Sequence, residues 1–331
     1  MPDAAGAPTE QGMAKGAVTA DETGARGPGW NPARLYDEYR FAGHLPRRGL
    51  LRNGRPALSG IDPRRVARYV LLTVRDPLCA YDEYPAEQIA RRLDEAQRIG
   101  DSGMFTTYSG LSEGVPVTVV AGGSGSPEAE LIMHELLEFT DADTFVRVGG
   151  SGGIHPRVNP GDVVVSTGVV RDEGMTRAYI PASFPAVAHH EVVLAMSRAA
   201  VELGCAFHQG VTRSSDSDFC GVGRPGVGGY FQPWHLDILE TWARAGVLNG
   251  DRESAAVVTL AGLFGKRSGS VCSVADNAIA DKPFVAGSGH VAAIDVALRG
   301  VVQLARLDAA RAASGGAHWV PASFESVAEN R

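Results

Sequence analysis

Residues 117–139 read VTVVAGGSGSPEAELIMHELLEF, and this stretch decides the fold class. The β-branched run at 117–121 predicts a buried strand, and the apolar spacing after Pro127 predicts a helix that ends near Phe139. Proline suits the first turn of a helix, and the glycine-rich segment Gly122–Ser126 makes the turn before it. A strand, a short turn and a helix in immediate succession are typical of α/β proteins.

The same alternation continues along the chain. Buried strands are also predicted at Tyr69–Val74, Phe145–Val148, Val163–Val170, Phe207–Val211 and Ser270–Val274. Further helices are predicted at Glu87–Arg98, Glu191–Leu203, Leu236–Ala245, Glu253–Phe264 and His290–Leu307. We therefore expect a single three-layer α/β domain with a mixed central sheet flanked by helices. The sheet is expected to be mixed because a short, proline-containing loop joins the runs near 145 and 163, which favours antiparallel pairing of the two.

The amino-acid composition indicates the class of protein and the limits of the folded domain. Its 331 residues are 44% hydrophobic and 21% charged with a net charge of −7, as in soluble globular proteins. Residues 1–30 carry hardly any large apolar side chains and are predicted to be a disordered tail. We expect the domain to span 31–308, followed by a C-terminal extension over 309–331 that is rich in Ala, Gly and Ser.

Several function classes are excluded by absent patterns. There is no run of about 18 apolar residues and no signal-peptide core, so we expect a cytoplasmic protein that does not enter a membrane. The mild acidity, without a Lys/Arg-rich stretch, argues against nucleic-acid binding. The four cysteines are widely spaced and form no C-x-x-C pair, which argues against structural zinc and a disulfide framework.

Two of the glycine clusters directly follow predicted strands. Gly122–Gly125 follows the run at 117–121, and Gly149–Gly153 follows Phe145–Val148. Ligands of α/β sheets bind at such strand ends, where backbone N–H groups can hold anions. Arg147 stands two residues before the second cluster. We therefore expect the two clusters to form one shared site, although each could also be a flexible turn.

Two segments fit the letters of known motifs but lack the neighbouring strand or helix that these motifs require. Gly221–Gly226 fits G-x-G-x-x-G, but no strong strand precedes it and no helix follows it, so a dinucleotide site is not predicted. Gly149–Gly153 fits the G-x-S-x-G nucleophile elbow, yet its continuation predicts a strand instead of a helix. A serine hydrolase that uses Ser151 with His235 or His290 is therefore a disfavoured alternative.

A longer stretch, FVRVGGSGGIHPRVNPGDVVVSTGVVRDEGMT at 145–176, resembles the central signature of the nucleoside phosphorylases, in particular the uridine phosphorylase branch. Five more segments resemble the same family in the same order: YVLLTVRDP (69–77), FTTYSGLSEGVPVTVVAGGSGSPEAE (105–130), FPAVAHHE (184–191), GVTRSSDSDF (210–219) and GVLNGDRESAAVVTLA (246–261). The resemblance implies a pentosyltransferase that cleaves an N-ribosidic bond with phosphate, giving a free base and ribose 1-phosphate.

The resemblance also implies roles for residues at matching positions. Asp276 and Arg147 would be catalytic. The nucleoside would be bound by Glu253, Arg252, Arg224, Phe219, His44 and Asn277. Phosphate would be bound by Arg147, Ser151, Gly150 and Arg75. His44 resembles a histidine lent by a neighbouring subunit, which implies a homo-oligomer, either a dimer or a trimer of dimers. No cofactor and no metal are implied.

The expected phosphate site departs from the family pattern. The family's Pro-Gly-Asp-Pro turn reads Val74–Pro77 here, with Arg75 in place of the glycine, and Cys79 and Gly103 stand where the family has arginines. Arg252 replaces a methionine and Val222 a glutamine. A nucleosidase that uses water instead of phosphate therefore remains an alternative. A relative that binds nucleosides without turnover is a second one.

Overall fold

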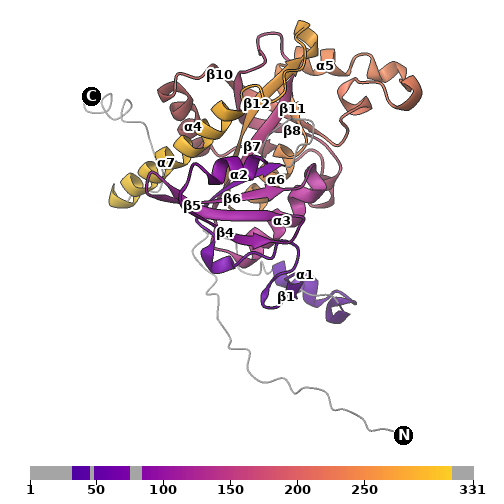
Figure 1. Ribbon diagram of the computed structural model, residues 1–331. Coiled ribbons are helices and arrows are strands. Elements are labelled where there is room, and N and C mark those ends of the chain that lie inside the picture. Colours follow the sequence, from indigo (N-terminus) through magenta and orange to yellow (C-terminus); the bar gives the residue numbers. More distant parts are fainter. Residues whose placement is uncertain (1–31, 45–47, 75–83, 315–331) are drawn as a thin grey trace, which may run out of the picture. The chain divides into compact units, whose positions relative to one another are not determined.

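The computed structural model describes residues 32–44, 48–74 and 84–314 (Figure 1). The chain divides into two units, residues 1–47 and residues 48–331, each described by itself. The described part of the first unit holds helix α1 (Pro32–Asp37) and a 3-10 helix, η1 (Ala42–His44). The predicted tail 1–30 and residues 315–331 of the predicted extension lie outside the described residues.

All other elements of the described residues belong to the second unit. Its strands are β1 (Leu51–Arg52), β2 (Arg55–Pro56), β3 (Tyr69–Val74), β4 (Asp94–Asp101), β5 (Thr106–Ser112), β6 (Val115–Gly122), β7 (Thr144–Gly153), β8 (Val163–Asp172), β9 (Ala186–Val187), β10 (Phe207–Ser215), β11 (Val247–Asp251) and β12 (Arg267–Asn277). Its α-helices are α2 (Pro85–Ala90), α3 (Ser126–Phe139), α4 (His190–Glu202), α5 (Ile238–Arg244), α6 (Ser254–Leu263) and α7 (His290–Ser314). Its 3-10 helices are η2 (Pro63–Arg65), η3 (Met175–Ala178), η4 (Cys220–Val222), η5 (Val227–Gly229), η6 (Pro233–His235) and η7 (Ala278–Ala280).

One large mixed sheet forms the centre of this unit. Its strand order is β11-β10-β8-β12-β7-β3-β6-β5-β4. The short strand β9 pairs antiparallel with Gly168 and Val169 of β8. Strands β6, β3, β7 and β12 run parallel, whereas β8 runs antiparallel to β12. Strand β11 pairs with β10 on one side and with the end of β7 on the other, so five strands close into a ring. The prediction of a mixed sheet is confirmed.

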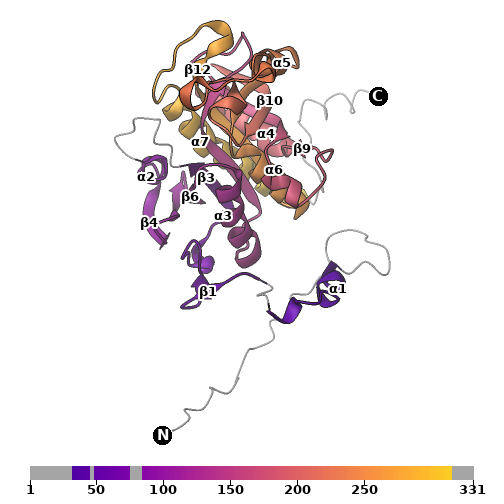
Figure 2. The ribbon, with the colours of Figure 1, turned by 90° about the vertical axis from the view of Figure 1, so that its right-hand side faces the viewer.

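Helices cover both faces of the sheet, as the three-layer prediction requires. Tyr69 and Leu71 of β3 pack with α2, α4 and α7 on one face, while Val70 and Leu72 pack with α3 and α6 on the other. Figure 2 shows α2 and α3 on opposite sides of β3 and β6. Alternate residues of one strand thus enter two hydrophobic layers, because side chains of a strand point to opposite faces. Among the described residues, no helix combines the length and the apolar character that a bilayer crossing requires.

Two predictions about these elements were wrong. The runs near 145 and 163 do not pair with each other, because β12 lies between β7 and β8. The segment that joins them passes the end of β12, where the Gly161 N–H donates to Val274 O. The predicted helix Glu87–Arg98 ends at Ala90, and Asp94–Asp101 is the edge strand β4. Most residues of β4 are exposed and polar. The segment therefore lacks the apolar pattern by which a buried strand is recognised in a sequence.

Candidate active site

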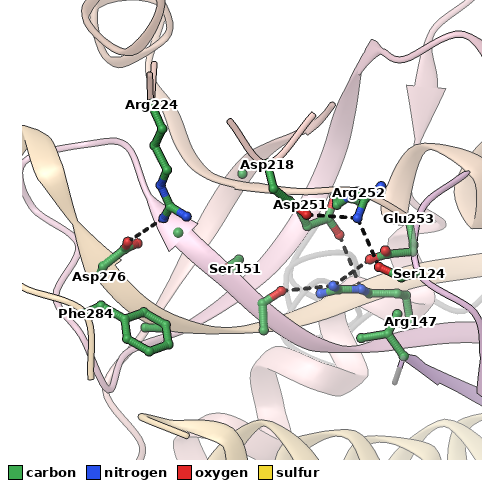
Figure 3. A pocket seen from close by; sticks show the side chains of 15 residues that line it. Ser124, Arg147, Ser151, Asp218, Arg224, Asp251, Arg252, Glu253, Asp276 and Phe284 are labelled. Carbon is green, nitrogen blue, oxygen red and sulfur yellow. Dashed lines mark hydrogen bonds and ion pairs between the residues drawn. The ribbon is translucent and has the colours of Figure 1, made fainter. Parts of the chain in front are cut away.

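The two glycine segments meet at a cleft made of two adjoining cavities, about 130 Å³ and 180 Å³ in volume, and Figure 3 shows the side chains that line the first of them. The first cavity is lined by Ser124 from the first segment and by Gly150 and Ser151 from the second. The second cavity extends past Arg213, Val222 and Leu239. Both are lined by Gly152, Asp218, Arg224, Gly250, Asp251, Arg252 and Asp276. Residues of both glycine segments therefore line one cleft, as the sequence predicted.

The second glycine segment is part of a strand, whereas the sequence predicted a loop. Strand β7 continues through Gly153, with Asn249 and Gly250 of β11 on one side and β12 on the other. Its glycines make room for charged side chains that cross the strand. A Cβ atom at Gly149 would lie 3.1 Å from the Arg147 guanidinium, and one at Gly152 would lie 2.8 Å from Asp276 Oδ1.

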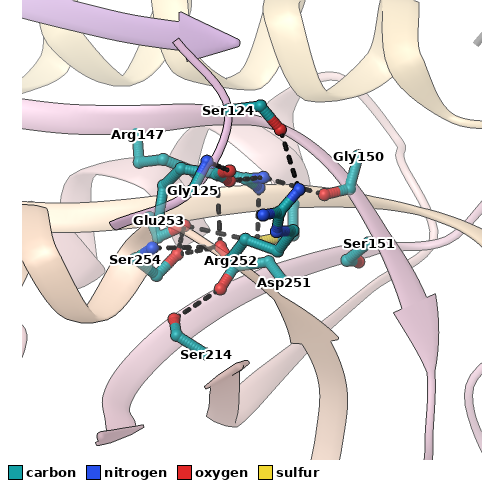
Figure 4. A network of polar contacts seen from close by, with 12 residues as sticks. Ser124, Gly125, Arg147, Gly150, Ser151, Ser214, Asp251, Arg252, Glu253 and Ser254 are labelled. Carbon is teal, nitrogen blue, oxygen red and sulfur yellow. Dashed lines mark hydrogen bonds and ion pairs between the residues drawn. The ribbon is translucent and has the colours of Figure 1, made fainter. Parts of the chain in front are cut away.

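Arg147 and Glu253 form a buried ion pair at the first cavity (Figure 4). Arg147 Nη2 donates to Glu253 Oε2 at 2.9 Å and to Gly150 O at 2.9 Å, and Nη1 donates to Cys272 Sγ at 3.2 Å. Burial opposes the charge of Arg147, but Asp251, Cys272 and Glu253 outweigh it and raise its pKa. Burial raises the pKa of Glu253 more than Arg147 lowers it. Glu253, which caps the start of α6, is held in place by its ion pair with Arg147.

The first glycine turn holds Glu253 from the other side. The Gly125 N–H donates to Glu253 Oε1 at 2.6 Å, and the Ser124 N–H donates to Glu128 Oε2 at 2.7 Å. Gly125 has a φ of 92°, which favours glycine, and a Cβ at Gly123 would overlap the Glu128 carboxylate. The expectation of free N–H groups is therefore wrong at positions 124 and 125, since carboxylates already occupy both.

Asp276 and Arg224 form a second ion pair, across the two cavities. Arg224 Nη2 donates to Asp276 Oδ2 at 3.0 Å. The side chain of Asp276 is 18% exposed and that of Arg224 is 52% exposed. Burial raises the pKa of Asp276, and Arg224 only partly offsets this effect. A carboxyl group with a raised pKa in a cleft is a candidate general acid.

Arg252 lies between the walls of the cleft. Its Nη1 donates to Ser124 Oγ at 3.1 Å and to Asp218 Oδ2 at 2.9 Å. Ser124 belongs to the turn before α3, whereas Asp218 follows β10. The guanidinium therefore joins two segments that are far apart in the sequence.

Comparison with known proteins identifies the family. The profile of the phosphorylase superfamily matches residues 78–305, more than half of the chain. The chain belongs to the phosphorylase superfamily. It is 38% identical over 259 residues to the uridine phosphorylase of Thermococcus kodakarensis, covering 78% of this chain and 90% of that protein. It is 35% identical over 192 residues to the Escherichia coli uridine phosphorylase, covering 58% and 76%. A guanosine phosphorylase of Halorubrum lacusprofundi is 26% identical over 194 residues, covering 59% and 75%.

Not every residue that was singled out from the sequence lies at the cleft. Asn277 is fully buried, and its Nδ2 donates to His155 O at 2.9 Å and Val158 O at 2.8 Å. It holds the segment after β7 in place and lines neither cavity. Phe219 is 63% exposed and also lines neither of them. His44 belongs to the unit 1–47, and Arg75 lies outside the described residues.

Ser151 lines the first cavity with its hydroxyl already engaged. Ser151 Oγ donates to Ser273 O at 2.8 Å and accepts from Asn249 Nδ2 at 2.9 Å. His235 instead accepts the N–H of Gln232. A nucleophilic serine needs a base within hydrogen-bond reach, so these contacts give the serine-hydrolase alternative no support.

Sequence reasoning missed several polar residues of the cleft. Asp251 accepts from Ser214 Oγ at 2.6 Å and faces Arg147 Nε at 3.3 Å. Asp218 pairs with Arg252, and Arg213 lines the second cavity. Asp251 and Asp218 lie in two segments that carry the resemblance, 246–261 and 210–219, which was the available signal. In the part of the chain that the structure describes, no cluster of three or more His, Cys, Asp or Glu side chains is arranged to hold a metal ion.

Proposed function

We propose that this protein is a nucleoside phosphorylase, which cleaves an N-ribosidic bond with phosphate to give a free base and ribose 1-phosphate. Its membership of the superfamily and its similarity to uridine and guanosine phosphorylases support the proposal. The observation that carries it is that one cleft holds two carboxyl groups, each of which forms an ion pair with an arginine. Glu253 pairs with Arg147, and Asp276 pairs with Arg224.

The chemistry needs both groups. As the bond between the base and the anomeric carbon breaks, its electron pair goes to the base and the sugar gains oxocarbenium character. Glu253, fixed by Arg147 and Gly125, would accept hydrogen bonds from ribose hydroxyls. Asp276 would donate its proton to a nitrogen of the leaving base, which neutralises the developing negative charge. A phosphate oxygen then forms the new bond to the anomeric carbon.

The second cavity is the proposed site of the base. Val222 and Leu239 give it an apolar wall, and Arg224 and Asp276 place a donor and a titratable carboxyl group at its edge. An acid that protonates a ring nitrogen assists a purine more than a pyrimidine, because a purine leaves through an imidazole ring with a basic second nitrogen. Purine nucleosides therefore belong in the test beside uridine.

The direct test is to incubate the purified protein with uridine, thymidine, inosine, guanosine and adenosine, with and without inorganic phosphate. Release of free base that requires phosphate, together with the pentose 1-phosphate (2-deoxyribose 1-phosphate from thymidine and ribose 1-phosphate from the others), is the expected result. The absence of base release from every nucleoside would contradict the proposal.

Hydrolysis is the second candidate, and one observation favours it. Arg147 is buried and donates to Glu253, Gly150 and Cys272, so phosphate would have to compete with these partners for its guanidinium group. Base release at the same rate without phosphate, and with ribose as the product, would identify a nucleosidase.

A further inference from the structure

The floor of the second cavity is bare backbone. Gly152 of β7 lies directly opposite Gly250 of β11 in an antiparallel pair, and both glycines line the cavity. Residues that face each other across such a pair carry their side chains on the same face of the sheet, so these two glycines leave that face free. A Cβ at Gly250 would lie 3.3 Å from Ile154 Cδ1, and Ile154 lines the same cavity. A planar ring can therefore lie flat against the two strands.

The size of the second cavity suits a base with two fused rings. Its volume is about 180 Å³, whereas a cavity of about 150 Å³ holds a single benzene ring. Val222 and Leu239 line it with apolar side chains, which suit the faces of an aromatic base. The cavity has room for a purine, and a pyrimidine would fill only part of it.

The ion pair of Asp276 and Arg224 lies where the two cavities meet. Both side chains line both cavities, and Arg224 Nη2 lies 3.0 Å from Asp276 Oδ2 (Figure 3). The first cavity is also lined by Glu253, the proposed ribose ligand, so the pair faces the part of the base that is near the sugar. Atoms at the far end of a base, such as N3 and O4 of uracil, would lie away from this pair.

When Asp276 is protonated, the pair presents two hydrogen-bond donors side by side. A 6-oxopurine carries two neighbouring acceptors on one edge, N7 and O6. Adenine has the N7 acceptor beside an N6 donor, and a pyrimidine such as uracil has the O4 acceptor beside a carbon atom. Of these bases, only the 6-oxopurine accepts hydrogen bonds from both side chains.

We propose that Asp276 and Arg224 together recognise N7 and O6 of a 6-oxopurine, so that inosine and guanosine are the substrates of this cleft. The inference rests on the proposed function, whose base site it specifies. As the bond to the sugar breaks, its electron pair enters the purine, the O–H bond of Asp276 breaks and an N7–H bond forms. Asp276 is then a carboxylate beside the Arg224 guanidinium, which is the ion pair that the structure shows.

The first test compares nucleosides with the wild-type protein in the presence of phosphate. We expect kcat/KM for inosine and guanosine to exceed that for adenosine and uridine at least about tenfold, because each of the latter lacks one of the two acceptors. In 7-deazaguanosine a carbon atom replaces N7, and this compound should react at least about 10²-fold more slowly than guanosine. A preference for uridine or adenosine, or equal rates with guanosine and 7-deazaguanosine, would overturn the inference.

Arg224→Gln tests the recognition of O6. A glutamine amide can donate to O6 or accept from N6, so the ratio of kcat/KM for inosine to that for adenosine should fall about tenfold. Arg198→Gln is the matched control, because Arg198 forms an exposed pair with Glu202 on α4, and its ratio should equal that of the wild type. An unchanged ratio in Arg224→Gln contradicts the assignment. Should this variant not fold, the comparison of nucleosides with the wild type decides.

Gly250→Val tests the floor of the cavity. Its side chain would occupy the face on which the base is proposed to lie, so kcat/KM should fall more for guanosine than for uridine, whose base is smaller. An equal fall for both nucleosides would show that Gly250 does not set the size of the base.

Binding of the free bases separates this inference from the proposed function. Hypoxanthine should raise the melting temperature of the wild type more than adenine or uracil does, and Arg224→Gln should reduce this difference. If both results hold for a protein that cleaves no nucleoside, the proposed function fails and the inference stands. Phosphate-dependent cleavage of uridine in preference to inosine has the reverse meaning.

Discussion

At the residue scale, Asp276 is the group on which the proposed departure of the base depends. Burial raises the pKa of its carboxyl, and we expect kcat to fall as the pH rises through that pKa, because the proton donor is then lost. Asp276→Asn cannot donate an acidic proton and should lower kcat roughly 10²–10⁴-fold. The measurement is the pH profile of kcat for the wild type and the variant, which should lack the alkaline decline.

Arg224→Gln provides the matching control. Arg224 lowers the pKa of Asp276, so removing its charge should move the alkaline decline of kcat to higher pH. An Asp276→Asn variant with the wild-type profile would show that Asp276 does not donate the proton.

The sequence identified several cleft residues by type and position, but not what they contact. Arg147 and Glu253 were both singled out, and their pairing was not foreseeable because it joins β7 to α6. Asn277 stands beside Asp276 in the sequence, yet its amide is bound to the backbone at His155 and Val158. Neighbouring residues on a strand point to opposite faces, so adjacency to a site residue does not place a side chain in the site.

At the element scale, two adjacent glycines of β7 should respond differently to a methyl group. A Cβ at Gly152 would meet the end of the Asp276 side chain, which can rotate, whereas a Cβ at Gly153 would lie 2.8 Å from the Asp276 backbone oxygen, which cannot. We expect Gly152→Ala to lower kcat with little change in the free energy of unfolding, and Gly153→Ala to cost about 1–3 kcal/mol. Urea denaturation and kcat measurements distinguish the two. Wild-type kcat in Gly152→Ala would show that the Asp276 position is not critical.

A buried ionic network fixes α7 to the opposite end of the sheet. Arg267 of β12 donates to Asp308 of α7 at 2.7 and 2.8 Å and to Glu191 of α4 at 3.0 Å. Tyr69 of β3 also donates to Asp308, at 2.7 Å. Arg267→Met leaves two buried carboxylates without this partner, and we expect it to reduce the free energy of unfolding by about 3 kcal/mol. Urea denaturation at neutral pH measures the loss, with Arg198→Met as a surface control.

The same network has a defined pH dependence. Burial alone would raise the pKa of Asp308 and Glu191, but the hydrogen bonds from Arg267 reverse this, and both values are lowered from 3.8 and 4.5. Their contribution to stability is therefore fully present above about pH 4.5 and is lost as the pH falls through the folded-state values. Unfolding free energies measured between pH 7 and pH 3 should fall less steeply in Arg267→Met. An equal slope would contradict the assignment.

Elements with a strong apolar pattern were predictable, and weakly patterned ones were not. The six predicted strands all exist, whereas β4, β5, β11 and the two-residue strands β1, β2 and β9 were missed. Strand β11 reads VLNGD, and its Asn-Gly-Asp end suggests a turn. It is a strand because β10 and β7 hydrogen-bond it from both sides. Pairing between strands distant in sequence overrides such local propensity.

At the scale of the whole molecule, closure of the five-strand ring creates the site. Strand β11 runs antiparallel to β7, with Asn249 opposite Gly153 and Gly250 opposite Gly152, which brings Asp251 and Glu253 beside the glycine segment. An open sheet with β7 and β8 paired, as the sequence suggested, would place β12 and Asp276 elsewhere. The fold class was therefore predictable from local pattern, but the assembly of the cleft depended on strand order.

The molecule should also act as an oligomer, and His44 offers a test. It is exposed in the separate unit 1–47, and the family resemblance implies that it serves the site of a neighbouring subunit. His44→Ala would then damage the neighbour's site, whereas Glu253→Gln damages its own. In a mixed dimer of these two subunits, one site would combine an intact Glu253 with an intact His44 and the other would have neither, so about half of the wild-type activity should return. Co-expression with two affinity tags yields the mixed dimer, and light scattering gives its mass. A mixed dimer as inactive as its parents would place His44 in its own subunit's site, and a fully active His44→Ala parent would show that His44 serves no site.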